Sequence, residues 1–187
     1  NTNVVINMEN NKANEWIEGG RKMHEFELIH TIKQKSYRQA SLIKGVGDDA
    51  AVFRSAGQDV VTALDTFVDR VHFSKETMDE IDLGYRVLAV NISDLAAMGA
   101  VPKFYLVSIV IPYDMSQDQV TSIFTGMEEI AGQYQMDLIG GDTVIGEVLT
   151  ISVTVIGYVN RNQVRYRHDA KENDLVFVTG TLGDASA

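Results

Sequence analysis

At four places in the sequence, counting the neighbours Asp48 and Asp49 as one, an aspartate stands where its carboxylate could bind a metal ion. Asp65 and Asp142 follow apolar stretches, Asp48 and Asp49 share a glycine-containing stretch, and Asp94 lies inside an apolar segment. Carboxylate oxygens select hard cations, and magnesium takes one or two of them and completes its shell with water and substrate phosphate. The pattern suits a metal–nucleotide site. Asp is also common in turns, so a structural role stays open for each residue.

The segment from Leu83 to Gly99 is apolar nearly all round, which predicts a buried helix. Helical spacing puts several residues on one face, namely Gly84, Val87, Asn91, Asp94 and Met98. Gly99 and Pro102 are typical of the end of such a helix. Because a buried carboxylate is costly without a partner, Asp94 is either a metal ligand or an acid paired with backbone or arginine.

Three further features could contact phosphate. Gly140-Gly141-Asp142 resembles a turn in which backbone amides approach an anion, although Gly-Gly also occurs in ordinary turns. His72 could hold a phosphate or a ring, or could be a solvated loop histidine. Arg161, Arg165 and Arg167 could bind phosphate through two hydrogen bonds, or form a solvated basic turn.

Composition excludes several classes of function. The chain has 187 residues, a net charge of −10 and no cysteine. No basic stripe exists to bind nucleic acid, and disulfides, zinc–thiolate sites and thiol catalysis are excluded. No apolar run approaches the roughly 20 residues that span a bilayer, and nothing indicates secretion, so we expect a cytoplasmic protein without a membrane partner. The GxxxxGK[ST] loop and the protein-kinase motifs are absent.

The expected elements mix helices and strands, so the predicted fold class is α+β. The periodicity predicts helices at 25–35, 81–98 and 116–135, and strands at 50–53, 59–64, 103–111, 137–139, 148–159 and 175–179. The turn at Ala56-Gly57 predicts a hairpin between the first two strands. Ser116 and Gln119 form a capping-box pattern.

The chain divides into three parts. Residues 1–22 are polar and without periodicity, which we interpret as a leader or an expression-derived extension. Residues 23–160 form one domain, and residues 161–187 contain a charged, turn-rich linker and the start of a further, truncated domain.

Taken together, four motifs resemble the thiamine-monophosphate kinase family, in the superfamily of aminoimidazole ribonucleotide synthetase (PurM) and selenophosphate synthetase. They are Gly45–Val52 (GVGDDAAV), Asp65–Phe73 (DTFVDRVHF), Val90–Ala100 (VNISDLAAMGA) and Leu138–Thr143 (LIGGDT). The likeness covers about Met23 to Ala187. A selenophosphate synthetase would carry a reactive cysteine or selenocysteine near its start. One departure is Ala63-Leu64, where the family often has hydroxyl residues.

The resemblance implies a fold, a reaction and a set of site residues. The fold would be PurM N-terminal-domain-like, with a mixed, largely antiparallel sheet packed by helices and pairing across a homodimer. The reaction would be ATP plus thiamine phosphate giving thiamine diphosphate plus ADP, with Mg²⁺. The implied magnesium ligands are Asp49, Asp65, Asp94 and Asp142, with Asp94 and Asp142 catalytic; Gly141, Asp142 and Arg167 would bind ATP, and His72 the thiamine phosphate.

Residues 23–160 would then be the ATP- and magnesium-binding N-terminal domain of such a kinase. Because Asp48 and Asp49 are neighbours in an extended segment, their side chains point to opposite faces and at most one is a direct ligand. Two alternatives remain. One is another ATP-dependent synthetase of the superfamily, and the other is a non-catalytic nucleotide-binding or dimerisation fragment.

Overall fold

The computed structural model describes residues 25–46, 52, 53, 55, 57–178 and 180. The elements are, in order, α1 Glu25–Ile32, β1 Leu42–Lys44, β2 Val52–Phe53, β3 Asp59–Val68, α2 Glu80–Ala97, β4 Val101–Pro112, α3 Gln117–Tyr134, β5 Asp137–Gly146, β6 Thr150–Val159 and the short 3₁₀ helix η2 Arg167–Asp169.

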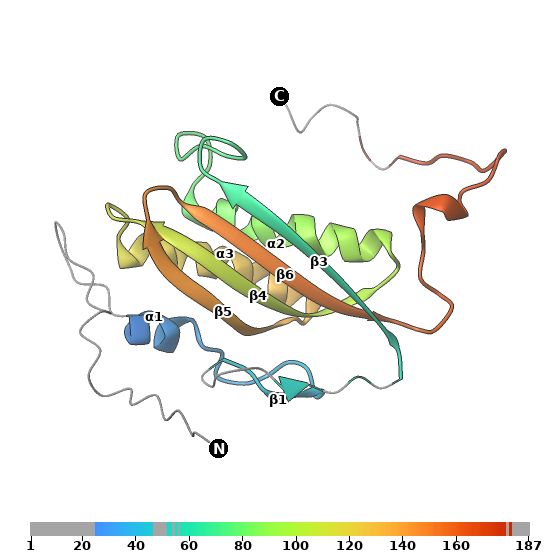
Figure 1. The fold of residues 1–187 in the computed structure, drawn as a ribbon, viewed down its shortest axis with the longest axis horizontal. Helices are drawn as coiled ribbons and strands as arrows, with labels where there is room; N and C mark the ends of the chain where they lie inside the picture. Colours follow the sequence, from blue (N-terminus) through green and yellow to red (C-terminus); the bar gives the residue numbers. More distant parts are fainter. Residues whose placement is uncertain (1–24, 47–51, 54, 56, 179, 181–187) are drawn as a thin grey trace, which may run out of the picture.

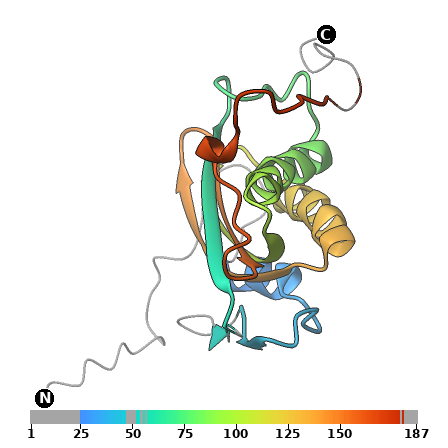
Figure 2. The ribbon, with the colours of Figure 1, turned by 90° about the vertical axis from the view of Figure 1, so that its right-hand side faces the viewer.

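Four long strands form the main sheet, in the order β3-β6-β4-β5. β6 pairs antiparallel with both β3 and β4, whereas β5 runs parallel to β4 because α3 carries the chain back between them. Helices α2 and α3 pack on one face of the sheet, and the other face is turned toward the viewer in Figure 1. Figure 2 shows these two layers edge-on. The expected α+β class and the mixed, largely antiparallel sheet are confirmed.

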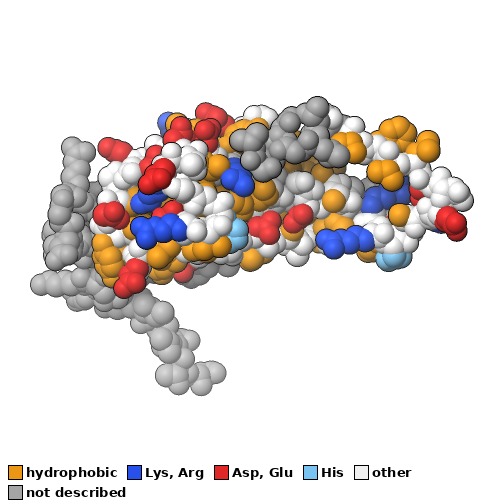
Figure 3. Space-filling model, turned by 90° about the horizontal axis from the view of Figure 1, so that it is seen from above, with side chains coloured by type: hydrophobic (Ala, Val, Ile, Leu, Met, Phe, Trp, Pro, Cys, Tyr) orange, Lys and Arg blue, Asp and Glu red, His pale blue; other side chains and the backbone are white. Residues whose placement is uncertain are grey.

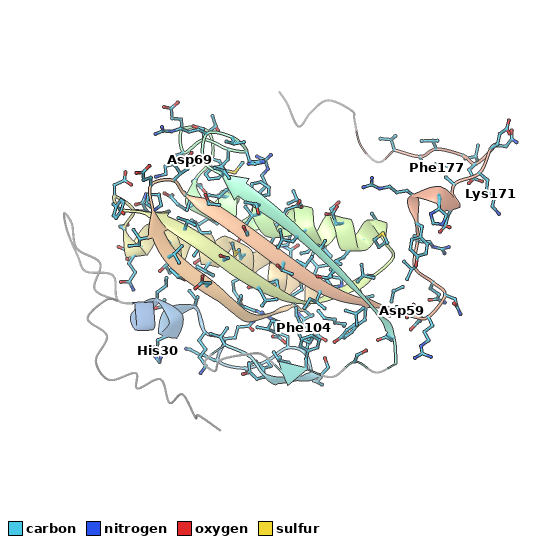
Figure 4. All side chains as sticks on the ribbon, in the orientation of Figure 1. His30, Asp59, Asp69, Phe104, Lys171 and Phe177 are labelled. Atoms are coloured by element: carbon cyan, nitrogen blue, oxygen red, sulfur yellow. The ribbon has the colours of Figure 1, made fainter. Side chains whose placement is uncertain are left out.

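The main core fills the space between the two helices and the sheet. Val87 and Leu95 of α2, Ile123 and Met127 of α3, and Val153 of β6 are all fully buried there. A second, smaller cluster lies at one end of the opposite sheet face, where β1 and β2 cover it. Its members are Leu42, Phe104, Ile139 and Tyr158, with the Phe53 ring 4.8 Å from that of Phe104 (Figure 4).

Both long helices begin at side-chain caps. Asp79 accepts a hydrogen bond from the Asp82 backbone amide at 2.8 Å, and Ser116 and Gln119 form the expected capping box. Gln119 also donates to Glu80 at 2.7 Å, which ties the start of α3 to the start of α2. These bonds satisfy amide groups that a helix leaves free in its first turn.

Helix α2 is less buried than its sequence predicts. Its inner face carries Gly84, Val87 and Asn91, but Asp94 is exposed. The expectation of an all-round buried helix is wrong because the sheet and α3 cover only one side. Asp137 is instead a fully buried carboxylate, and it accepts the Arg38 and Gln39 backbone amides at 2.7 Å each.

The strands also differ from the expected ones in pairing and length. β2 pairs with β1, and β3 pairs with β6, so the predicted hairpin across Ala56-Gly57 does not form. Strand β5 continues to Gly146 instead of stopping at Ile139. Residues 175–178 form no strand, and Leu175, Val176 and Phe177 are 80%, 91% and 84% exposed, because no described strand pairs with them (Figure 4). Among the described residues, no helix is both long and apolar enough to cross a membrane.

Candidate functional site

Strand β3 and helix α2 hold two of the predicted site aspartates on the same side of the sheet. Asp65 pairs in register with the buried Val153, so its side chain projects from the face of the sheet that the helices cover. Asp65 is half-buried and Asp94 is exposed, and neither carboxylate has a hydrogen bond or ion pair to another described residue. Both are therefore free to accept a ligand.

The direction of α2 sets where Asp94 lies relative to β3. The chain leaves the end of β3, turns through residues 69–79 and returns along the strand as α2, so the helix runs against it. Arg86 lies beside Phe67, with its guanidinium carbon 5.9 Å from the ring centroid. Asp94 is eight residues further on, about 12 Å along the helix. Asp65 lies in the same direction from Phe67, two residues or roughly 7 Å back along β3.

His72 lies at the other end of this arrangement, in the turn that follows β3. Its Nδ1 accepts the Val68 backbone amide at 3.2 Å, and its ring centroid is 5.6 Å from that of Phe67. Because Nδ1 is the acceptor, Nε2 carries the proton of the neutral ring and is a donor. The side chain is exposed, so that donor can reach a ligand. Figure 4 labels the neighbouring Asp69 at this end of β3.

The Asp142 side chain projects from the opposite face of the sheet. Registry aligns it with Ser108 of β4, Ser152 of β6 and Thr66 of β3, all on the face without helices. Thr66 and Ser152 share a hydrogen bond of 2.8 Å, and Asp142 is exposed at the end of this polar row. Within one chain, the sheet therefore separates Asp142 from Asp65.

Gly141 lies in the middle of β5 and not in a turn, so the turn expected at Gly140-Gly141-Asp142 is wrong. A Cβ atom at Gly141 would lie 2.0 Å from the Val107 carbonyl oxygen. The glycine is needed for close approach of β4 and β5, and this requirement alone accounts for the residue type.

Arg167 lies outside the sheet, on the segment that follows β6. It opens the 3₁₀ helix and is exposed, as are Arg161 and Arg165. The Arg165 backbone amide donates to the Met98 carbonyl at 3.0 Å, which fixes this segment to the end of α2. Tyr166 and His168 stack at 5.2 Å beside Arg167. Asp48 and Asp49 lie outside the described residues.

The described residues contain no group of three or more His, Cys, Asp or Glu side chains that could hold a metal ion. Asp65 and Asp94 are unpaired carboxylates on one side of the sheet, so each has oxygens available to a cation. Magnesium needs only one or two carboxylates when phosphate and water complete its shell. Figure 3 shows acidic and basic side chains interspersed over the β3–α2 side, with apolar groups where residues 171–178 lie.

Comparison with known proteins identifies the family of the chain. Residues 47–159 match the model of the family described as AIR synthase related protein, N-terminal domain. The chain belongs to this family. The match covers β3, α2, β4, α3, β5 and β6 and the turn between β3 and α2, and so includes Asp65, His72, Asp94 and Asp142.

Relatives within the AIR synthase related family carry a more specific name. The chain is 46% identical over 167 residues to a thiamine-monophosphate kinase of Bacillus subtilis (strain 168), which covers 88% of this chain and 51% of that protein. A crystal structure of thiamine-monophosphate kinase from Stenotrophomonas maltophilia K279a is 37% identical, with a TM-score of 0.64, covering 74% of this chain and 42% of that one.

A structure of AaThiL complexed with AMPPCP and TMP is 27% identical, with a TM-score of 0.55, covering 73% of this chain and 42% of that one. The resemblance to thiamine-monophosphate kinases and the PurM-like fold are confirmed. The chain spans about half the length of the curated relatives it matches.

The motif analysis missed Arg86, which the structure brings to the β3–α2 site through its contact with Phe67. Arg86 and Phe67 lie between His72 and the two aspartates of this family member. A sequence signal existed, because Arg86 is the one basic residue of the segment from Glu80 to Ala97.

Proposed function

We propose that the protein takes part in the phosphorylation of thiamine phosphate by ATP, yielding thiamine diphosphate and ADP. The observation that carries this proposal is the site on β3 and α2, where the unpaired carboxylates of Asp65 and Asp94 lie on the same side of the sheet and His72 exposes its Nε2 in the turn after β3. The similarity to thiamine-monophosphate kinases, one of them in complex with the ATP analogue AMPPCP and with TMP, supports the same reaction.

In this mechanism, His72 and the aspartates position two phosphates. The Nε2–H of His72 donates to the phosphate of the acceptor and sets its orientation. Asp65 and Asp94, with Asp49 and Asp142, are the proposed magnesium ligands; the bound metal supplies neutralisation of phosphate charge. The acceptor oxygen is already anionic, so no strong general base is needed and catalysis rests on positioning and charge stabilisation.

The nucleotide side of the site is proposed to involve Gly141, Asp142 and Arg167. Because Asp142 projects from the helix-free face, whereas Asp65 projects from the other one, we propose that a homodimer forms through the helix-free face and brings Asp142 to the interface. That face carries exposed apolar residues on both edge strands, including Leu64 at 60% and Val144 at 41% exposure. We place the enzyme in the cytoplasm.

Release of ADP on addition of thiamine phosphate tests the reaction. With ATP and magnesium, we expect ADP to form in proportion to thiamine phosphate, and no ADP to form with thiamine in its place, because thiamine lacks the attacking phosphate oxygen. ADP formation with a different acceptor only would favour another synthetase of the superfamily. Nucleotide binding without turnover on any acceptor would favour a binding or dimerisation fragment.

A further inference from the structure

The lone arginine of α2 is held in place without a carboxylate partner. Arg86 is exposed, and none of the ion pairs among the described residues includes it, although Asp82 stands one helical turn before it. Its guanidinium carbon lies 5.9 Å from the centroid of the Phe67 ring. The positive charge is therefore positioned by an aromatic ring and remains available to an anion.

Phe67 provides a rigid base for two donors. The ring is only 7% exposed and belongs to the main core, so it is fixed by packing. Arg86 lies over this ring, and the His72 ring lies 5.6 Å from it. A guanidinium over an aromatic face keeps its N–H groups in its own plane, where they can reach the two oxygens of a phosphate.

The charges around the pair select the ligand. Asp65 is two residues before Phe67 on the same face of β3, and Asp94 follows Arg86 on α2. These carboxylates repel a bare anion but attract a divalent cation, which in turn binds phosphate oxygens. A phosphate monoester that contacts both the cation and the two donors therefore matches the arrangement.

We infer that Arg86 binds the phosphate group of the acceptor, thiamine phosphate, together with His72. The inference rests on the proposed function and adds a residue that the sequence motifs do not contain. Arg86 makes the charged, two-pronged contact, and His72 makes the single one.

Steady-state kinetics of Arg86→Met test the assignment. Methionine keeps an apolar stem over Phe67 and removes the charge, so packing is retained. We expect the KM for thiamine phosphate to rise about 10-fold or more, as loss of a charged hydrogen bond to phosphate requires, while the KM for ATP changes less than about twofold. Arg86→Lys keeps the charge but lacks the forked guanidinium group, so its KM for thiamine phosphate is expected to lie between those of wild type and Arg86→Met.

Arg70→Ala is the matched control. Arg70 lies in the turn at the same end of β3, its side chain is 90% exposed, and it faces Asp69 at 4.0 Å. The Arg70→Ala variant removes the same charge from the same end of the domain. Both KM values are expected to stay within about twofold, because the Arg70 charge is exposed to solvent, faces Asp69 and is screened. Melting without ligand is expected to be the same for wild type and Arg86→Met, which separates a binding role from a structural one.

The outcomes distinguish the two proposals. If wild type turns over but Arg86→Met leaves the KM for thiamine phosphate unchanged, the Arg86 assignment is overturned and the proposed function stands. An increase in the KM for ATP alone also overturns it, because the arginine then serves the nucleotide. If wild type forms no ADP with thiamine phosphate, the proposed function fails and the acceptor role of Arg86 fails with it.

Discussion

At the scale of single residues, Asp94 is exposed on α2 and makes no bond to another described residue. A structural acid would be paired, so the unpaired carboxylate favours a ligand role. In the metal-free protein, Asp94 only adds negative charge to the side of the sheet that also carries Asp65, and removing that charge relieves repulsion. The stability of the unliganded fold should therefore not depend on Asp94.

We predict that Asp94→Asn melts no lower than wild type in chelator and loses most of the stabilisation that magnesium–ATP gives to wild type. The measurement is a pair of thermal melts for each protein, one in chelator and one in magnesium–ATP. A mutant that melts several degrees lower in chelator, and keeps the full ligand stabilisation, would show that Asp94 is structural.

Tyr105 gives the fold a dependence on high pH. Burial raises the pKa of the Tyr105 hydroxyl well above its ordinary value of 10.0, with a further contribution from Glu128. The folded state keeps this proton while the unfolded state loses it above that value, so the stability is fully present below pH 10.0 and is lost as the pH rises beyond it.

We predict that Tyr105→Phe loses less stability than wild type between about pH 9.5 and pH 11.5, because the group that ionises on unfolding has been removed. Denaturant unfolding at a series of pH values measures this slope. Tyr113→Phe is the control, since that side chain is 66% exposed, and its slope should match that of wild type. Equal slopes for all three proteins would contradict the prediction.

At the scale of elements, α2 and α3 cross with two glycines at the contact. A Cβ atom at Gly84 would lie 1.9 Å from the Ile123 carbonyl oxygen, and one at Gly126 would lie 1.9 Å from that of Ile81. Each glycine lies against the backbone of the other helix at the crossing, so the distance between the two helices depends on both.

Gly84→Ala should destabilise the fold by about 1–3 kcal/mol or more, because the methyl group forces the helices apart. Gly132→Ala on α3 has nothing within 4 Å of its added methyl group and should stabilise by up to about 1 kcal/mol through helix propensity. Denaturant unfolding of both variants measures the two changes in the free energy of unfolding, which are expected to have opposite signs. A neutral Gly84→Ala would mean that the crossing is loose.

Local signals in the sequence predicted the elements better than their partners. Ser116 and Gln119 give a capping box from four residues alone, and it forms. By contrast, β3 pairs with β6, whose first residue, Thr150, faces Val68, a choice that no local pattern contains. The exposure of Asp94 likewise depends on how much of α2 the sheet and α3 cover.

The same limit applies to the site. The family resemblance implied Asp65 and Asp142 as two of four magnesium ligands, but the strand preceding Asp142 was expected to end at Ile139. Once β5 continues to Gly146, alternation along the strand fixes the face from which Asp142 emerges, and registry with Ser108 shows it to be opposite Asp65. Register between strands is a tertiary property, and it decides which carboxylates can meet.

At the scale of the whole molecule, the helix-free face of the sheet is the feature that needs a partner. β3, β5 and β6 have 10 residues each, and four strands at ordinary spacing present a face of about 600 Å² in projection. Accessible area exceeds projected area, so this approaches the roughly 800 Å² per partner of a stable interface. β1 and β2 cover one end of the face only.

Leu64 lies in the open part of this face, in register with Thr154 of β6 and Leu106 of β4, and is 60% exposed. A lysine there would place a charge in the apolar centre of the proposed interface, which is costly to bury. We predict that wild type is a dimer by sedimentation equilibrium and that Leu64→Lys shifts the equilibrium toward monomer by at least about tenfold in dissociation constant.

Val71→Lys is the control for this shift, because Val71 is 71% exposed in the turn after β3 and lies outside the sheet. It adds the same charge and should leave the dimer intact. A wild type that stays monomeric at all accessible concentrations would contradict the dimer. A Leu64→Lys variant that remains dimeric would place the interface on another face, and Asp142 would then lie away from the interface.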